Sequence, residues 1–130
     1  MHYFEGLALA IIFMLAHLVE GLHFPKPVEG NIENKWAIHQ LQTTADFAPN
    51  NFFAKFFTGG LNFQAVHHLY PKICHTHYPE ISKILEKTAK EFDVPYVINP
   101  TFFGALASHF RFMKMAGTVE EFRFVEPKVA

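Results

Sequence analysis

The apolar positions at the start of the chain form one unbroken block. The segment from Leu7 to Val19 (LALAIIFMLAHLV) contains one polar residue, His17. A helix needs about 20 apolar residues to cross a membrane, and Glu5 interrupts the pattern before that length is reached. A buried helix of a water-soluble protein also fits this length. We interpret residues 1–24 as the end of a transmembrane helix that begins outside this chain.

The next segments alternate turn signals with short helical patterns. Pro25 ends the first helix. Trp36 and Thr43 share one face of a predicted short helix, and Asn31 is its expected cap. Further on, Phe stands on both sides of Lys55 in the sequence FFAKFF. These rings either lie flat at a membrane interface or face the core, and the pattern favours neither.

The remaining patterns are helical as well. After two glycines, LNFQAVHHLY predicts one helix that Pro71 ends. Apolar stripes predict two amphipathic helices, over residues 79–93 and 101–115. Residues 122–125 (FRFV) form either a short strand or a loose tail. The pattern as a whole predicts an all-α fold.

Composition points to lipid and to metal, and it excludes one class of ligand. The chain has 16 Phe and nine His among its 130 residues. Phe suits a lipid-facing surface or an apolar pocket, and His is the commonest side chain that holds a transition metal. Eleven basic and twelve acidic residues leave the chain near neutrality. That balance argues against nucleic-acid binding, which needs a basic excess.

Gln64, His67 and His68 form the sharpest cluster of candidate ligands. They stand at positions i, i+3 and i+4 of a predicted helix, so their side chains converge. An iron or zinc ion would satisfy both imidazoles, and Gln64 would ligate weakly or hold a water. The alternative is that both histidines are wetted at an interface.

Other histidines give weaker signals. His75 and His77 would share a face with Cys74 in a strand and bind zinc, but no further Cys completes the site, and we prefer a polar loop. His17 and His23 would lie on opposite sides of a continuous helix. Glu20 stands three residues from each of them and is placed to orient whichever one serves as a ligand.

Several segments together resemble a known family. NFQAVHHLYP, with TGG before it and HYPEI and VPY after it, is similar to the third histidine box (QxxHH) of membrane fatty acid desaturases of the acyl-lipid and front-end type. LHFP resembles the family's additional His-containing segment. WAIHQLQTT resembles its W-x-x-x-Q-x-x-x-T stretch. The order of these segments, from about Phe13 to Tyr96, makes the resemblance specific.

The resemblance implies a four-helix membrane protein with a cytosolic cap and two irons, held by three histidine boxes and one additional His. Gln64, His67 and His68 match the third box, and His23 matches the additional His. No ligand role is carried onto His39. Residues 1–24 would be the end of the last transmembrane helix, 25–78 the metal-site segment and 79–130 the cytosolic C-terminal helical cap.

No HxxxH or HxxHH box is present upstream. We therefore expect the C-terminal part of a di-iron desaturase, inactive alone, whose parent inserts a double bond into a fatty acyl chain with O2 and external electrons. The implied partners are membrane lipid, an acyl-CoA or acyl-lipid substrate, and an electron donor such as cytochrome b5 or ferredoxin. The alternative is a small, non-catalytic, membrane-associated helical protein with a mononuclear metal site or none.

Overall fold

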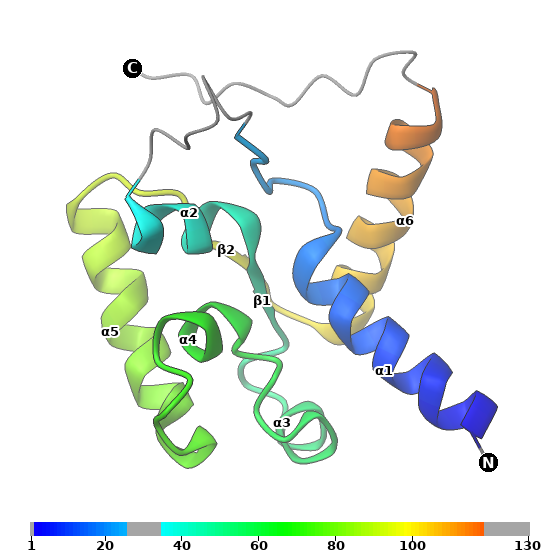
Figure 1. The fold of residues 1–130 in the computed structure, drawn as a ribbon, viewed down its shortest axis with the longest axis horizontal. Helices are drawn as coiled ribbons and strands as arrows, with labels where there is room; N and C mark the ends of the chain where they lie inside the picture. The colour runs from blue at the N-terminus through cyan, green and yellow to red at the C-terminus, as the bar shows by residue number, and fades with distance from the viewer. Residues whose placement is uncertain (1, 26–34, 119–130) are drawn as a thin grey trace.

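The computed structural model describes residues 2–25 and 35–118, and these are mostly helical (Figure 1). The elements in chain order are α1 (His2–His17), α2 (Trp36–Thr43), β1 (Ala45–Phe47), α3 (Phe52–Thr58), α4 (Gln64–Leu69), the 3-10 turn η1 (His75–His77), α5 (Tyr78–Glu91), β2 (Val97–Asn99) and α6 (Phe102–Thr118). The all-α expectation is corrected by the two strands. Each is three residues long, too short to give an alternating pattern in the sequence.

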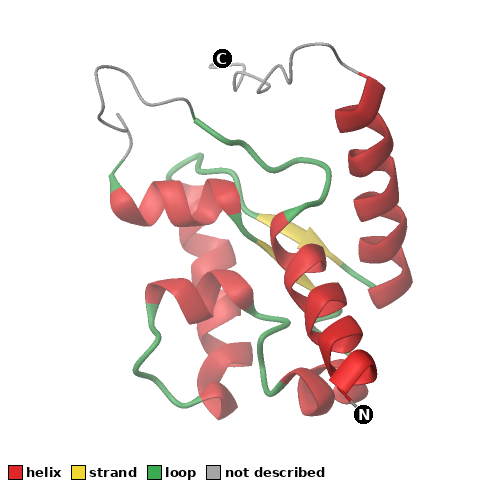
Figure 2. Ribbon diagram, turned by 45° about the vertical axis from the view of Figure 1, so that its right-hand side comes forward, coloured by secondary structure: helices red, strands yellow, loops and turns green. Residues whose placement is uncertain are grey.

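Strand β1 lies in the interior of the fold and pairs in parallel with β2 (Figure 2). All three of its residues are buried. Because side chains alternate along a strand, Phe47 packs on one face against Leu15 and Ala16 of α1 and Ala105 of α6. Asp46 points to the other face, where α4 and α5 lie. A three-residue strand therefore joins the two halves of the fold.

Helix α6 holds the chain just beyond the end of α1. The Nδ1 atom of His109 lies 2.7 Å from the carbonyl oxygen of Leu18 and donates to it. The backbone N–H of Glu20 donates to the Ser108 hydroxyl at 3.0 Å. Arg111 adds an exposed ion pair with the Glu20 carboxylate at 2.7 Å. Three side chains of α6 thus fix the segment that directly follows His17.

No helix within the described ranges has both the length and the apolar character to cross a membrane. Helix α1 has 16 residues. The predicted transmembrane helix in residues 1–24 is therefore not confirmed.

Helix α3 carries the FFAKFF segment. Asn51 caps it, its side-chain oxygen accepting from the backbone N–H of Ala54 at 3.1 Å. The four Phe side chains of α3 are 66–75% exposed. The core-facing interpretation of this segment is therefore wrong, and its position at a membrane interface stays a prediction.

The periodic helices were predictable to within a few residues. Residues 79–93 were expected and α5 is Tyr78–Glu91; residues 101–115 were expected and α6 is Phe102–Thr118. The predicted cap Asn31 and the segment 122–125 lie outside the described residues.

Two adjacent glycines connect α3 to α4 and differ in what surrounds them. Both have positive φ, +60° at Gly59 and +86° at Gly60. A Cβ at Gly59 would meet nothing within 4 Å, whereas one at Gly60 would lie 2.7 Å from the Cβ of His75. The carbonyl of Gly60 also accepts from the N–H of Phe63 at 3.0 Å. Close approach of two chain segments, and not only the turn, requires glycine at position 60.

We predict that Gly60→Ala lowers the free energy of unfolding by about 2–5 kcal/mol, the sum of left-handed backbone strain and overpacking against His75. Gly59→Ala is the matched control, with about 1 kcal/mol from the backbone alone. Chemical denaturation followed by circular dichroism measures both. Equal losses from the two variants would contradict the close approach.

Candidate metal centre

Helix α4 brings two of the predicted ligands together. The side-chain Nε2 atom of Gln64 lies 3.1 Å from Nε2 of His68, one helical turn further on. Gln64 is buried and His68 is half-buried. The amide and the imidazole therefore meet at one point on the inner side of a six-residue helix.

His17 reaches the same point from the end of α1. Its Nε2 atom lies 3.4 Å from Nε2 of Gln64, and its ring centroid lies 5.2 Å from that of His68. Sequence reasoning considered His17 only beside His23 and did not place it with Gln64, because 47 positions separate the two residues. One signal was available, since His17 is the only polar residue in the apolar run.

The second imidazole of α4 lies beside this group and is held by α5. The Nδ1 atom of His67 is 3.1 Å from the Tyr78 hydroxyl, and its ring centroid is 6.1 Å from that of His68. The ring of Tyr78 is buried against Phe63 and Val66. Because the hydroxyl occupies Nδ1, the Nε2 atom is the nitrogen left for a ligand role at His67.

A side chain of α2 orients His68. The Nδ1 atom of His68 lies 2.7 Å from Oε1 of Gln40. An amide oxygen only accepts, so Nδ1 carries the proton and Nε2 keeps its lone pair, which accepts from the Gln64 amide. Burial lowers the pKa of His68, and the positive charges that His17 and His67 can carry lower it further. The neutral imidazole, which is the form that binds a metal, is thus favoured.

The other predicted site residues lie elsewhere. The backbone N–H of His23 donates to the carbonyl of Gln42 at 2.8 Å, and its ring is half-buried. The Glu20 carboxylate pairs with Arg111 on the surface. The ligand role of His23 and the orienting role of Glu20 stay predictions. His39 has a buried Nδ1 atom with no hydrogen-bond partner among the described residues.

The region after α4 is not a strand. His75 and His77 lie in the turn η1 and are exposed, as is Cys74. The strand geometry that would have joined them in a zinc site is therefore wrong. Within residues 2–25 and 35–118, no three His, Cys, Asp or Glu side chains are grouped so that they could hold a metal ion by themselves.

A buried carboxylate lies beneath α4 and was not anticipated from the sequence. One oxygen of Asp46 accepts from the N–H of Ala65 at 3.0 Å. The other accepts from the hydroxyls of Ser82, at 3.3 Å, and Tyr96. Burial raises the pKa of Asp46 to about 6, against these hydrogen bonds, which lower it. Its position in a very short strand left no sequence signal.

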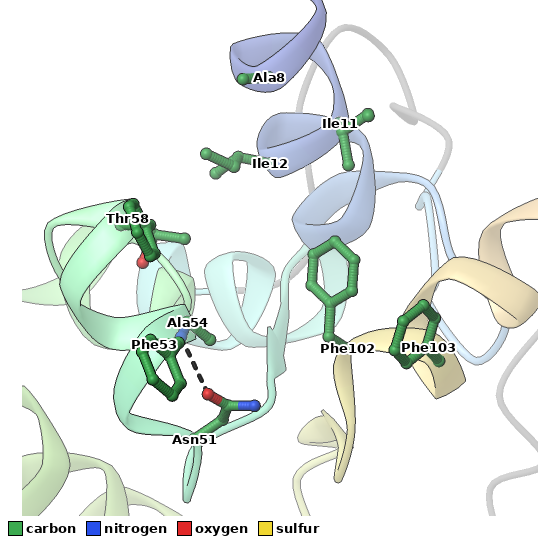
Figure 3. Close-up of a pocket in the computed structure, with 10 residues that line it drawn as sticks. Ala8, Ile11, Ile12, Asn51, Phe53, Ala54, Thr58, Phe102 and Phe103 are labelled. Carbon is green, nitrogen blue, oxygen red and sulfur yellow. Dashed lines mark hydrogen bonds between the residues drawn. The ribbon is translucent and has the colours of Figure 1, made fainter.

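An apolar cavity of about 420 Å³ lies between α1, α3 and the start of α6 (Figure 3). Ile11 and Ile12 of α1 line one side, and Phe102 of α6 lines another. The remaining lining residues are Ala8, Asn51, Phe53, Ala54, Phe57, Thr58 and Phe103. The same helix α1 that lines this cavity ends at His17.

Comparison with known families tests the resemblance. A family model described as "Fatty acid desaturase" matches residues 1–100. The chain belongs to the fatty acid desaturase family. It is 46% identical over 122 residues to an sn-1 linoleoyl-lipid 6-desaturase of Arthrospira platensis, an alignment that covers 94% of this chain and 33% of the relative.

Other desaturases give similar matches. An acyl-lipid (8-3)-desaturase of Physcomitrium patens is 50% identical over 115 residues, covering 88% of this chain and 24% of that protein. The chain thus spans a third or less of the lengths of these curated relatives. No solved structure matches it.

The desaturase-like segments meet in space. Gln40 comes from the WAIHQLQTT stretch and bonds His68 of the QxxHH segment. Tyr78 comes from HYPEI and bonds His67. Tyr96 of VPY reaches Asp46 beneath the same helix. Three of the segments that carry the family resemblance therefore contact α4 or the carboxylate beneath it.

We predict that neutral His68 carries its proton on Nδ1, the less common tautomer, because Gln40 accepts there. Long-range 1H–15N correlation spectra of the imidazoles measure this. In Gln40→Leu the proton should move to Nε2 of His68, while His67, held by Tyr78, keeps its spectrum as the internal control. An Nε2-protonated His68 in the unmodified chain would contradict the arrangement.

Proposed function

We propose that this chain is the C-terminal, third-histidine-box part of a membrane enzyme that inserts a double bond into a fatty acyl chain. The observation that carries the proposal is the convergence of Gln64 and His68 from α4 with His17 from α1. Family membership supports the reaction class. O2, with two electrons and two protons from outside, takes two hydrogens from adjacent methylenes and leaves as two waters.

The donor set fits iron and is incomplete. Imidazoles suit iron, zinc and copper, and an amide oxygen is a weaker ligand. Two irons need about eight ligands at four or more each, so the proposed di-iron centre takes at least half of them from parts of the parent that this chain does not span. Iron would supply the O2 activation and hydrogen abstraction that no amino-acid side chain performs.

The residues of the chain would orient and shield this centre. Gln40 holds His68 with Nε2 toward Gln64, and Tyr78 holds His67. The apolar cavity beside α1 would take part of the acyl chain and exclude water from it. Helix α5 would belong to the cytosolic cap. The substrate would be an acyl-CoA or acyl-lipid, and the electron donor a protein such as cytochrome b5 or ferredoxin.

Two histidines compete for the role of the additional ligand. The resemblance matched His23, through LHFP. The proximity of His17 to Gln64 and His68 supports His17. We therefore propose His17 as a ligand, and experiment must decide on His23.

In the parent-length enzyme, His17→Ala, His67→Ala and His68→Ala should each abolish desaturation, because a metal site depends on its ligand count. His75→Ala, at an exposed position, is the control and should keep most of the product. Gas chromatography of cellular fatty acids in a host that lacks the product measures the yield. Full yield from His68→Ala would refute the site, and loss in His23→Ala with full yield in His17→Ala would return the role to His23.

We also predict that this chain alone binds no more than one iron and makes no product. Three imidazoles and one amide are too few for two metals. Purified chain in lipid, supplied with Fe(II), an electron donor and acyl substrate, is assayed for iron stoichiometry and unsaturated product. Two irons per chain, or product above a no-protein control, would contradict the prediction.

A genomic reading frame that continues upstream into HxxxH and HxxHH would separately support the desaturase parent over a small non-catalytic protein.

A further inference from the structure

Helix α4 begins without a cap of its own. It has six residues, and the side chain of its N-cap residue, Phe63, makes no capping hydrogen bond. The first amides of any helix lack partners within it, and a buried amide without a partner costs about 1–3 kcal/mol. Gln64 and Ala65, which start this helix, are both buried. An acceptor from another element is therefore required at this end.

Asp46 supplies that acceptor from β1. Its side chain is fully buried, and its Oδ1 atom accepts from the N–H of Ala65 at 3.0 Å. The N–H of Gln64 is a further backbone hydrogen-bond partner of the same carboxylate. A negative group at a helix N-terminus is also favoured by the helix dipole. The start of α4 is thus tied to the central strand and not to its own flanking residue.

The second oxygen of the carboxylate fixes the direction of the first. Oδ2 accepts from the Ser82 hydroxyl of α5 at 3.3 Å and from the Tyr96 hydroxyl. These two hydroxyls lie 3.1 Å from each other. Contacts on both oxygens leave the carboxylate one orientation, with Oδ1 toward α4.

A helix this short does not hold its position by its own hydrogen bonds. Its place depends on tertiary contacts, and a small shift of its first turn would move Gln64 directly and both imidazoles with it. The 3.1 Å and 3.4 Å distances from Gln64 to His68 and His17 would then change.

We propose that Asp46 is a positioning residue of the metal centre, whose acceptor oxygen holds the start of helix α4 so that Gln64 and His68 meet His17, with His67 beside His68. It touches no reacting atom and acts through the backbone of α4. The expected effect on metal binding rests on the proposed function. The anchoring of α4 does not depend on any metal. The oxygen, and not the charge, is the essential group.

The first test needs no metal. In the full chain in detergent micelles, amide hydrogen exchange by NMR should be at least about tenfold faster at Ala65 in Asp46→Ala, with the interior amides of α1 and α5 unchanged. Asp46→Asn keeps an acceptor oxygen and should retain the protection. Asp93→Asn makes the same chemical change at an exposed position and should leave exchange unaltered. Unchanged exchange at Ala65 in a folded Asp46→Ala would overturn the proposal.

The second test uses Co(II) as the probe, read by its ligand-field absorption. Asp46→Ala should raise the Kd about 10–100-fold, as loss of an outer support of a metal site does, with the circular dichroism spectrum unchanged. Asp46→Asn should restore the Kd to within about threefold of the unmodified chain. If Asp46→Ala does not fold, Asp46→Asn decides: fast exchange at Ala65 or a lost Co(II) spectrum in that variant would overturn the proposal.

The two tests separate the two hypotheses. Absence of a Co(II) spectrum in the unmodified chain would show that these donors do not bind metal without the rest of the parent, and the exchange data alone then decide the anchoring. Protection at Ala65 that depends on residue 46 supports the anchoring on its own. A Co(II) Kd that is the same in Asp46→Ala and the unmodified chain, with both folded, contradicts the link between the anchor and the metal.

Discussion

The fold depends on one buried strand of three residues that is used on both faces. Phe47 faces α1 and α6, where it packs in an apolar cluster with Leu15 and Ala105. Asp46, one residue earlier, faces α4 and α5 and accepts hydrogen bonds from both. An apolar contact tolerates small sliding, whereas hydrogen bonds at 3.0 Å do not. The strand therefore fixes α4 more exactly than it fixes α1.

Helix α1 needs a second constraint, and α6 supplies it. The hydrogen bond from His109 to the carbonyl of Leu18 is partly buried, so breaking it leaves polar groups without water. The exposed pair of Arg111 with Glu20 contributes about 0–1 kcal/mol at most. The position of His17 thus relies on the partly buried hydrogen bond of His109 more than on the exposed ion pair of Arg111.

Local patterns were read correctly from the sequence, and long-range ones were not. The stripe of α5 and the spacing of Gln64 with His68 repeat within one or two helical turns, so periodicity predicts them. His17 meets that pair across 47 residues, and its partnership follows from packing alone. Asp46 lies in a strand that is too short to show an alternating apolar and polar pattern, so the sequence did not predict its burial. The exposed rings of α3 were undecided because one turn of Phe suits a core and a lipid surface equally.

One helix, α1, contributes side chains to both the apolar cavity and the imidazole cluster. Ile12 lines the cavity, and His17 follows five residues later at the end of the same helix, about 7.5 Å along its axis. Any sliding of α1 would move Ile12 and His17 by the same amount and preserve the separation of these two side chains. What it would change is the fit of His17 to α4, which the strand holds independently. The fit between His17 and α4 therefore depends on the hydrogen bonds that α6 makes with the residues just after α1.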